Sequence, residues 1–236
     1  MNNKKNKDNY IRKPFFIFIK KILRIFIKKT RYVYLDEKLK GPFIILSNHS
    51  AAAGPLSYEF YFNEPFRFWG TYEMNSGLIM TYKYLSYTYY HKKKHWNIHL
   101  SRLFCLIAAP VCNLFYKGLN LISTYPDTRF RKSLRESIET IKTNNNLIIF
   151  PEASENGYYE ELTEFHEGFI IFLEYLSKNK INIPIYVAYF RKKERICVFD
   201  KPIYINDLLD LKLSRKALAV KLKDRCNSLG KMDIKY

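Results

Sequence analysis

The run Ile44-Ile45-Leu46-Ser47-Asn48-His49-Ser50 joins a short apolar segment to an abrupt polar end. Because an unbroken run of isoleucine and leucine suits a strand buried on both faces, residues 43–47 are predicted to form a core strand. The small residues 51–54 that follow allow other groups to approach the backbone closely. A strand end holds an imidazole more rigidly than a loop does. His49 is therefore a candidate catalytic residue, and a hydrogen-bonded histidine without chemistry is the alternative.

A second apolar run with a polar end lies about a hundred residues further on, where residues 147–150 precede Pro151-Glu152-Ala153-Ser154. A strand at 119–123 and an amphipathic helix at 127–143 come before it, which predicts a strand–helix–strand unit with parallel strands. Ligands bind beyond the carboxyl ends of parallel strands. His49 and Glu152 are therefore predicted to share one edge of the sheet and to converge on one pocket.

The remaining pattern completes an α/β fold. It predicts a helix at 165–178, strands at 183–190 and 196–199, and a last helix capped by Ser214. The fold class expected is a central, mostly parallel mixed sheet flanked by helices, within one domain at 32–236.

Positive charge is concentrated at the N-terminus. The chain has 236 residues and a net charge of +18, and residues 1–31 hold eleven lysines and arginines against one aspartate. Residues 1–13 are predicted to be a basic disordered tail, and residues 14–31 to be a basic amphipathic helix. Such a charge favours an anionic partner.

The predicted helix at 14–31 fits an interfacial membrane anchor. Its longest uncharged run, Pro14 to Ile19, is far shorter than the ~20 residues that span a bilayer. Bulky apolar residues and lysines together suit a helix lying in an anionic membrane surface, which predicts a peripheral or monotopic protein at the cytoplasmic face of the cell membrane. A helix packed on its own domain, with solvated lysines, is the alternative.

An aromatic and apolar insertion is expected around 74–118. Residues 91–96 form a basic aromatic patch, read as a solvated loop or a second membrane contact. Residues 100–114 are mostly apolar, and Pro110 is predicted to break them into two pieces. A buried helix and a membrane-dipping hairpin are both consistent with this pattern.

The sequence shows no motif for binding a metal ion or nucleic acid. The four cysteines form no Cys-x-x-Cys pair, and with the histidines they make no metal-binding pattern, so a reduced intracellular protein without a metal is expected. Nucleic-acid binding would rest on charge alone, because no helix-turn-helix, zinc-finger or RNP-like motif is present.

The two strand-end motifs together resemble a known family. Asn48-His49 followed by Phe150-Pro151-Glu152 resembles the glycerol-3-phosphate and lysophospholipid acyltransferase family (PlsC-like). Later segments that also match its order and spacing are Glu167-Gly168, Ile183-Pro184-Ile185 and Val198 to Ile203. The resemblance implies a divergent, membrane-associated acyltransferase of phospholipid biosynthesis.

The resemblance also implies roles for residues. His49 would be the general base that deprotonates an acceptor hydroxyl, which then attacks the thioester of acyl-CoA or acyl carrier protein, with no bound cofactor. Glu152 would contact hydroxyls of a lipid-like acceptor. The expected substrate-binding residues are Asn48, Phe150, Pro151, Glu152 and Ser154.

The sequence departs from the family pattern where the family places its charges. Gly54 stands where an aspartate usually orients the histidine, and Thr124 and Glu155 stand near the positions of two arginines that hold the acceptor phosphate. Val187 replaces a proline of the fourth block.

These departures predict replacements elsewhere. Glu59 or Glu73, and less readily Asp127, would supply the carboxylate for His49, and Arg129 or Arg131 would hold an anionic acceptor. An acceptor without phosphate is the other possibility. A non-catalytic lipid- or membrane-binding protein on the same fold is the alternative function.

Overall fold

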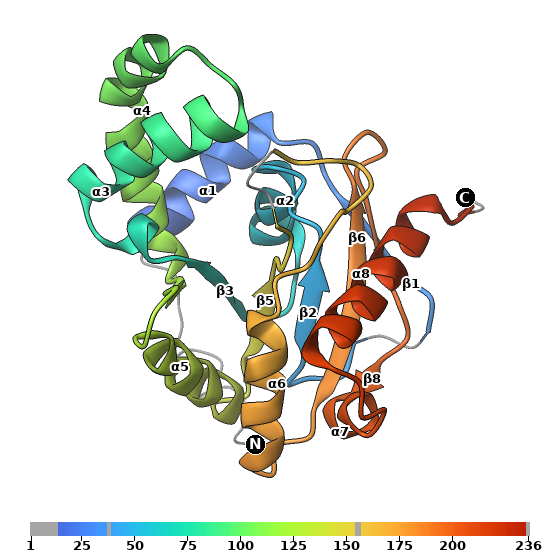
Figure 1. Ribbon diagram of the computed structural model, residues 1–236. Helices are drawn as coiled ribbons and strands as arrows, with labels where there is room; N and C mark the ends of the chain where they lie inside the picture. The colour runs from blue at the N-terminus through green and yellow to red at the C-terminus, as the bar shows by residue number, and fades with distance from the viewer. Residues whose placement is uncertain (1–13, 37–38, 154–156, 235–236) are drawn as a thin grey trace.

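The computed structural model describes residues 14–36, 39–153 and 157–234. The predicted tail at 1–13, together with Ser154 and Glu155, lies outside the described residues. The described strands form an eight-stranded sheet in the order β1-β7-β6-β2-β5-β3-β4, with β8 paired to β6 (Figure 1). The strands are β1 (Arg31–Tyr34), β2 (Ile44–Ser47), β3 (Phe66–Thr71), β4 (Ile122–Thr124), β5 (Asn146–Ile149), β6 (Pro184–Arg191), β7 (Ile196–Phe199) and β8 (Ile203–Tyr204).

The centre of the sheet is parallel. Strands β6, β2, β5, β3 and β4 run in one direction, while β7 and β8 pair antiparallel with β6. Leu46 of β2 lies opposite Ile149 of β5, so the two neighbouring strands end side by side. The mostly parallel mixed sheet is thereby confirmed, and the residues after both strands meet at one edge, as predicted.

Helices cover both faces of the sheet. Helices α5, α6 and α8 pack on one face through residues such as Ile138, Phe172 and Leu222, while Phe16 of α1 and Tyr58 of α2 lie in the core of the other face (Figure 1). The helices are α1 (Pro14–Phe26), α2 (Ala53–Tyr61), the 3₁₀ turn η2 (Tyr72–Asn75), α3 (Leu78–Lys83), the π-helix η3 (Tyr84–Lys93), α4 (Ile98–Leu119), α5 (Phe130–Lys142), α6 (Gly168–Lys178), α7 (Ile205–Leu209) and α8 (Arg215–Lys231).

Helices α1, α3, η3 and α4 gather at one end of the molecule, and we call them the apolar lobe (Figure 1). The Phe16 and Phe115 rings lie 5.0 Å apart and join α1 to α4. Any side chain at Gly118 would overlap Phe16, so the glycine permits this close approach. Asn97 caps α4 by accepting hydrogen bonds from the N–H groups of His99 and Leu100.

Two boundaries in the lobe differ from the prediction. Residues 98–119 form one helix although Pro110 lies within it, so the predicted break is wrong. A proline inside a helix costs about 3 kcal/mol, and packing on both sides of Pro110 offsets this cost. Before Pro110, Cys105 and Ala109 are buried with Leu85, and after it Phe115 packs on Phe16. The N-terminal helix ends at Phe26 rather than at residue 31, because Arg31 already pairs in β1 with Ile196 of β7.

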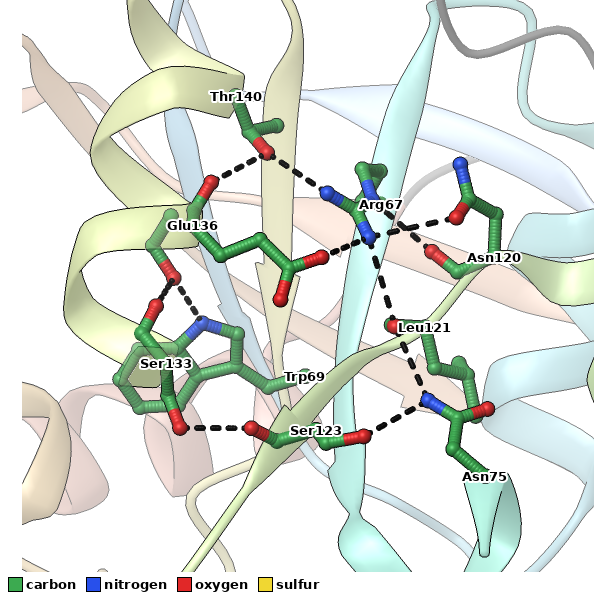
Figure 2. Close-up of polar contacts among 10 residues, drawn as sticks. Arg67, Trp69, Asn75, Asn120, Leu121, Ser123, Ser133, Glu136 and Thr140 are labelled. Carbon is green, nitrogen blue, oxygen red and sulfur yellow. Dashed lines mark hydrogen bonds and ion pairs between the residues drawn. The ribbon is translucent and has the colours of Figure 1, made fainter. Parts of the chain in front are cut away.

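A buried arginine ties the lobe to the sheet. Figure 2 shows Arg67 of β3 donating hydrogen bonds to the carbonyl oxygen of Asn120, at 2.9 Å, and to Thr140 Oγ1, at 3.2 Å, with Glu136 as its ion-pair partner. Asn120 adopts a left-handed conformation (φ 51°) as α4 ends and the chain turns into β4. The network therefore fixes where the lobe returns to the sheet.

Candidate active site

Asn48 fixes the turn after β2. Its side-chain amide donates to the carbonyl oxygen of Phe190 at 3.1 Å and accepts from the Phe190 N–H at 2.6 Å. The next two residues, Ser50 (φ 47°) and Ala51 (φ 55°), both adopt the left-handed conformation, which non-glycine residues rarely do. Asn48 is buried and fully engaged with β6, so its observed role is to hold the backbone on which His49 stands.

Glu152 holds the same turn from the other side. Its Oε2 accepts a hydrogen bond of 2.8 Å from the His49 N–H, and the Ser50 N–H also bonds to this carboxylate. Burial raises the pKa of Glu152 to about 7, although the two backbone hydrogen bonds and the charge of Lys93 act in the opposite direction. The carboxylate lines the cavity and at the same time positions the His49 backbone.

The His49 imidazole lies between two aromatic rings. Tyr158 stacks on it with centroids 5.0 Å apart, and Phe150 meets it edge-on at 5.0 Å. Its Nδ1 atom is buried, and none of the residues that the structure describes offers it a hydrogen-bond partner of good geometry. Burial, helped by the charge of Lys93, lowers the pKa of His49 to about 4, against a weaker opposing effect of the Ala51 backbone. The ring is therefore a neutral proton acceptor at pH 7.

The carboxylate partners predicted for His49 do not bond to its Nδ1. Glu59 is buried on α2 and pairs with Lys20 of α1 at 2.6 Å, while Glu73 accepts a hydrogen bond from Thr71. Asp127 is paired with Arg129. The predicted pairing is thus absent, since each of these carboxylates has a nearer partner of its own.

The tightness of the turn disfavours any side chain at position 54, where the sequence resemblance leads one to expect an aspartate. Gly54 lies in the first turn of α2, and a Cβ atom there would overlap the carbonyl oxygen of His49 and lie 3.1 Å from that of Asn48. An aspartate could fit only if the backbone shifted.

A cavity of about 810 Å³ opens beside these residues. His49, Phe150, Pro151 and Glu152 form part of its wall, as does Glu73. Its other walls come from α2, from the ends of β3 and β4, from the starts of α5 and α6 and from the apolar lobe. Most of these side chains are apolar, among them Leu56, Phe68, Phe115, Tyr116, Leu119 and Leu121. The cavity is wide enough for a drug-sized or lipid-like ligand.

Lys93 lines this cavity, and among the described residues no other lysine or arginine does so. Arg129, which the sequence suggested, pairs with Asp127 and lies over the rings of Tyr72 and Tyr125, 5.2 and 4.6 Å from their centroids. Arg131 is exposed on α5. The basic patch at 91–96 was the available signal for Lys93, but nothing in the sequence linked that patch to His49.

The described residues contain no group of three or more histidine, cysteine, aspartate or glutamate side chains that could hold a metal ion.

The fold has a counterpart of known structure. The chain matches the crystal structure of the 1-acyl-sn-glycerophosphate (LPA) acyltransferase PlsC from Thermotoga maritima with a TM-score of 0.53, over 100% of this chain and 86% of that one. The chain has the PlsC acyltransferase fold. At 16% sequence identity the likeness establishes the fold alone. No family model matches the sequence, and no curated protein matches it.

Proposed function

We propose that this PlsC-fold protein is a divergent membrane-associated acyltransferase, which moves a fatty acyl group from a thioester donor to a hydroxyl of a lipid-like acceptor. The observation that carries the proposal is the juxtaposition of His49 and Glu152 at the ends of two adjacent parallel strands, on the wall of a largely apolar cavity. Acyl-CoA or acyl carrier protein would supply the thioester, and the reaction would belong to phospholipid biosynthesis.

His49 acts as the general base in this proposal. With its pKa near 4 the imidazole is unprotonated at pH 7, and because Nδ1 is buried, the proton of the acceptor hydroxyl passes to Nε2. The hydroxyl oxygen attacks the thioester carbonyl carbon, the carbon–sulfur bond breaks, and the thiolate leaves and takes up the proton from the imidazolium. Glu152 keeps the imidazole in place through the backbone and does not move the proton itself.

No carboxylate among the described residues bonds to Nδ1 of His49, which predicts a slow reaction. In the serine-protease triad, replacing the aspartate that orients the histidine lowers kcat by about 10⁴. Here Tyr158 and Phe150 restrict the ring instead, and neither can stabilise an imidazolium as a carboxylate does.

The apolar lobe is proposed as the membrane-binding surface, at the cytoplasmic face of the cell membrane. Ile25 and Phe26 of α1 and Ile107 of α4 are about four-fifths exposed, and the basic residues Lys21, Arg24, Lys28 and Lys29 lie beside them in α1 and just after it. Exposed apolar side chains next to lysines favour an anionic lipid surface. Helix α4 alone among the described helices is long and apolar enough to cross a bilayer. Its packing on η3 and the contact of its Phe115 with Phe16 of α1 favour a monotopic arrangement.

The test is acyl transfer from labelled acyl-CoA and acyl carrier protein to a panel of lipid acceptors. His49→Ala is expected to lower turnover by about 10²–10⁴-fold, the usual contribution of a general base. His99→Ala, an exposed histidine of α4, serves as the matched control and should leave turnover unchanged. Undiminished turnover in His49→Ala would remove His49 from the mechanism.

The second candidate function is lipid binding without catalysis on the same fold. Two observations favour it: within the described part of the chain Nδ1 of His49 has no partner, and the ring of Tyr158 stacks on the imidazole. It predicts liposome binding that survives His49→Ala, together with no turnover on any acceptor. Robust wild-type turnover would exclude this candidate.

A further inference from the structure

Lys93 reaches the His49 cavity from a part of the chain that is far from both strand-end motifs. It is the last residue of η3, a ten-residue π-helix, and its half-buried side chain lines the same cavity as His49 and Glu152. π-Helical segments occur frequently at functional sites. The segment that carries Tyr158 contacts η3 directly, since a Cβ atom at Gly157 would lie 3.4 Å from the carbonyl oxygen of Lys93.

The lysine and the histidine flank one aromatic ring. Lys93 Nζ lies 5.5 Å from the centroid of the Tyr158 ring, and that ring stacks on the His49 imidazole at 5.0 Å. The positive charge acts on both groups of the site, because it lowers the pKa of His49 and that of Glu152. Ammonium, phenol and imidazole thus form one end of a cavity whose other walls are mostly apolar.

We propose that Lys93 binds a phosphate group of the substrate beside His49. The inference rests on the proposed acyl transfer for the identity of the substrate. Its physical basis is that a phosphate entering a largely apolar cavity needs a cationic side chain, and Lys93 is the lysine or arginine found among the described residues of the wall. Thr124, which also lines the cavity, is neutral and cannot replace it. The side chain that makes the site select an anionic substrate therefore comes from the apolar lobe.

The phosphate could belong to the acceptor headgroup or to the thioester donor, and kinetics distinguish the two. Lys93→Met keeps the length of the side chain and removes its charge. Lys92→Met is the matched control, because Lys92 is exposed on the same helix, lies 4.9 Å from the Tyr87 ring and does not line the cavity. The acceptors compared are a lysophosphatidic acid and the monoacylglycerol of the same chain length. The donors compared are acyl-CoA and an acyl-N-acetylcysteamine, which has no phosphate.

If Lys93 holds the acceptor phosphate, Lys93→Met raises the KM for the lysophosphatidic acid about ten- to a hundredfold, the usual loss for a hydrogen bond to a charged group, and leaves the monoacylglycerol unaffected. If it holds the donor phosphate, the rise appears in the KM for acyl-CoA and is absent with the phosphate-free donor. Unchanged KM values for all four substrates would overturn the proposal.

A binding measurement separates this proposal from the proposed function. Glycerol 3-phosphate is titrated into the full-length protein while the imidazole NMR signals of His49 are followed, with glycerol as the uncharged control. We expect a saturable shift in the wild type and in Lys92→Met that is weakened at least tenfold in Lys93→Met, whether or not acyl transfer is detected. Equal binding by wild type and Lys93→Met in this titration, with unchanged KM values, would remove Lys93 as a phosphate ligand.

Discussion

The cavity has two unlike walls. At the sheet edge Asn48 and Glu152 are buried and hydrogen-bonded to backbone groups, so the position of His49 is determined by β2, β5 and β6. Across the cavity the apolar lobe exposes Ile25, Phe26 and Ile107 to solvent on its outer side and presents Lys93 on its inner side.

The two walls therefore differ in function: one positions His49 and the other carries the charge and the outer apolar surface. The sheet edge holds His49, the proposed proton acceptor, in a fixed place, and the lobe brings Lys93 and the surface proposed to meet lipid. Variants at the sheet edge should therefore change stability and turnover, whereas variants on the outer face of the lobe should change membrane binding alone.

The largest expected effect is on the pH dependence of stability at the sheet edge. Folding lowers the pKa of His49 from 6.5 to about 4. Between these pH values the folded protein binds fewer protons than the unfolded chain, so the contribution of His49 to stability rises with pH. The pKa of Glu152 rises from 4.5 to about 7, so its contribution falls as pH rises through that range. The two contributions nearly cancel in the wild type.

Each single variant removes one of the two contributions, so the free energy of unfolding should then depend on pH through the other residue alone. Relative to wild type, the free energy of unfolding of His49→Gln is expected to fall by about 3 kcal/mol between pH 4.5 and 7, and that of Glu152→Gln to rise by a similar amount. Urea unfolding at a series of pH values measures both. The double variant is the control and should run parallel to wild type. Parallel profiles for the single variants would show that neither group is perturbed in the folded state.

The next effect concerns the tight turn at Gly54. Because its Cβ atom would overlap the His49 carbonyl oxygen, Gly54→Ala is expected to destabilise the protein by about 1–3 kcal/mol. Gly168→Ala is the matched control, since Gly168 also begins a helix and its Cβ atom would meet only Phe130 at 3.9 Å. That variant should be neutral or up to about 1 kcal/mol more stable. Urea unfolding tests the pair.

The same geometry bears on catalysis. Gly54→Asp restores the carboxylate that the PlsC-like sequence pattern has at this position, yet it should not raise turnover, because the backbone must move His49 to accommodate the side chain. A gain in turnover would show that the turn adapts and that the absent aspartate alone limits the reaction.

The smallest expected effect lies on the outer face of the lobe. Ile107→Asp should weaken binding to anionic liposomes about tenfold or more, since burying an isoleucine in lipid contributes roughly 1.5–3 kcal/mol. Val220→Asp, at an exposed apolar position of α8, is the matched control. Sedimentation with phosphatidylglycerol vesicles measures both, and unfolding in urea should be unchanged. Equal loss in the two variants would mean that the lobe is not the membrane-binding surface.

Short-range patterns in the sequence predicted most of the sheet. The apolar runs at residues 43–47 and 147–150 gave β2 and β5, and the intervening helix implied that they are parallel. That parallel arrangement was enough to place His49 and Glu152 at one edge, because the carboxyl ends of neighbouring parallel strands meet there. The break predicted at Pro110 was wrong, because packing between distant segments offsets the local penalty of about 3 kcal/mol for a proline inside a helix.

The roles of individual charges depended on contacts between distant segments. Glu59 was a plausible partner for His49 by its position in the chain, but α1 folds back and Lys20 pairs with it. Lys93 lies 44 positions from His49 in the sequence and reaches the same cavity only because η3 packs against the segment that carries Tyr158.

By itself, then, the sequence determined the α/β fold and the meeting of His49 with Glu152, because hydrophobic periodicity and strand direction are encoded locally. Only the tertiary structure decided which charges face the cavity and why position 54 is glycine. Those outcomes depend on distances between segments far apart in the chain, and the overlap at Gly54 is a matter of backbone geometry that no residue pattern records.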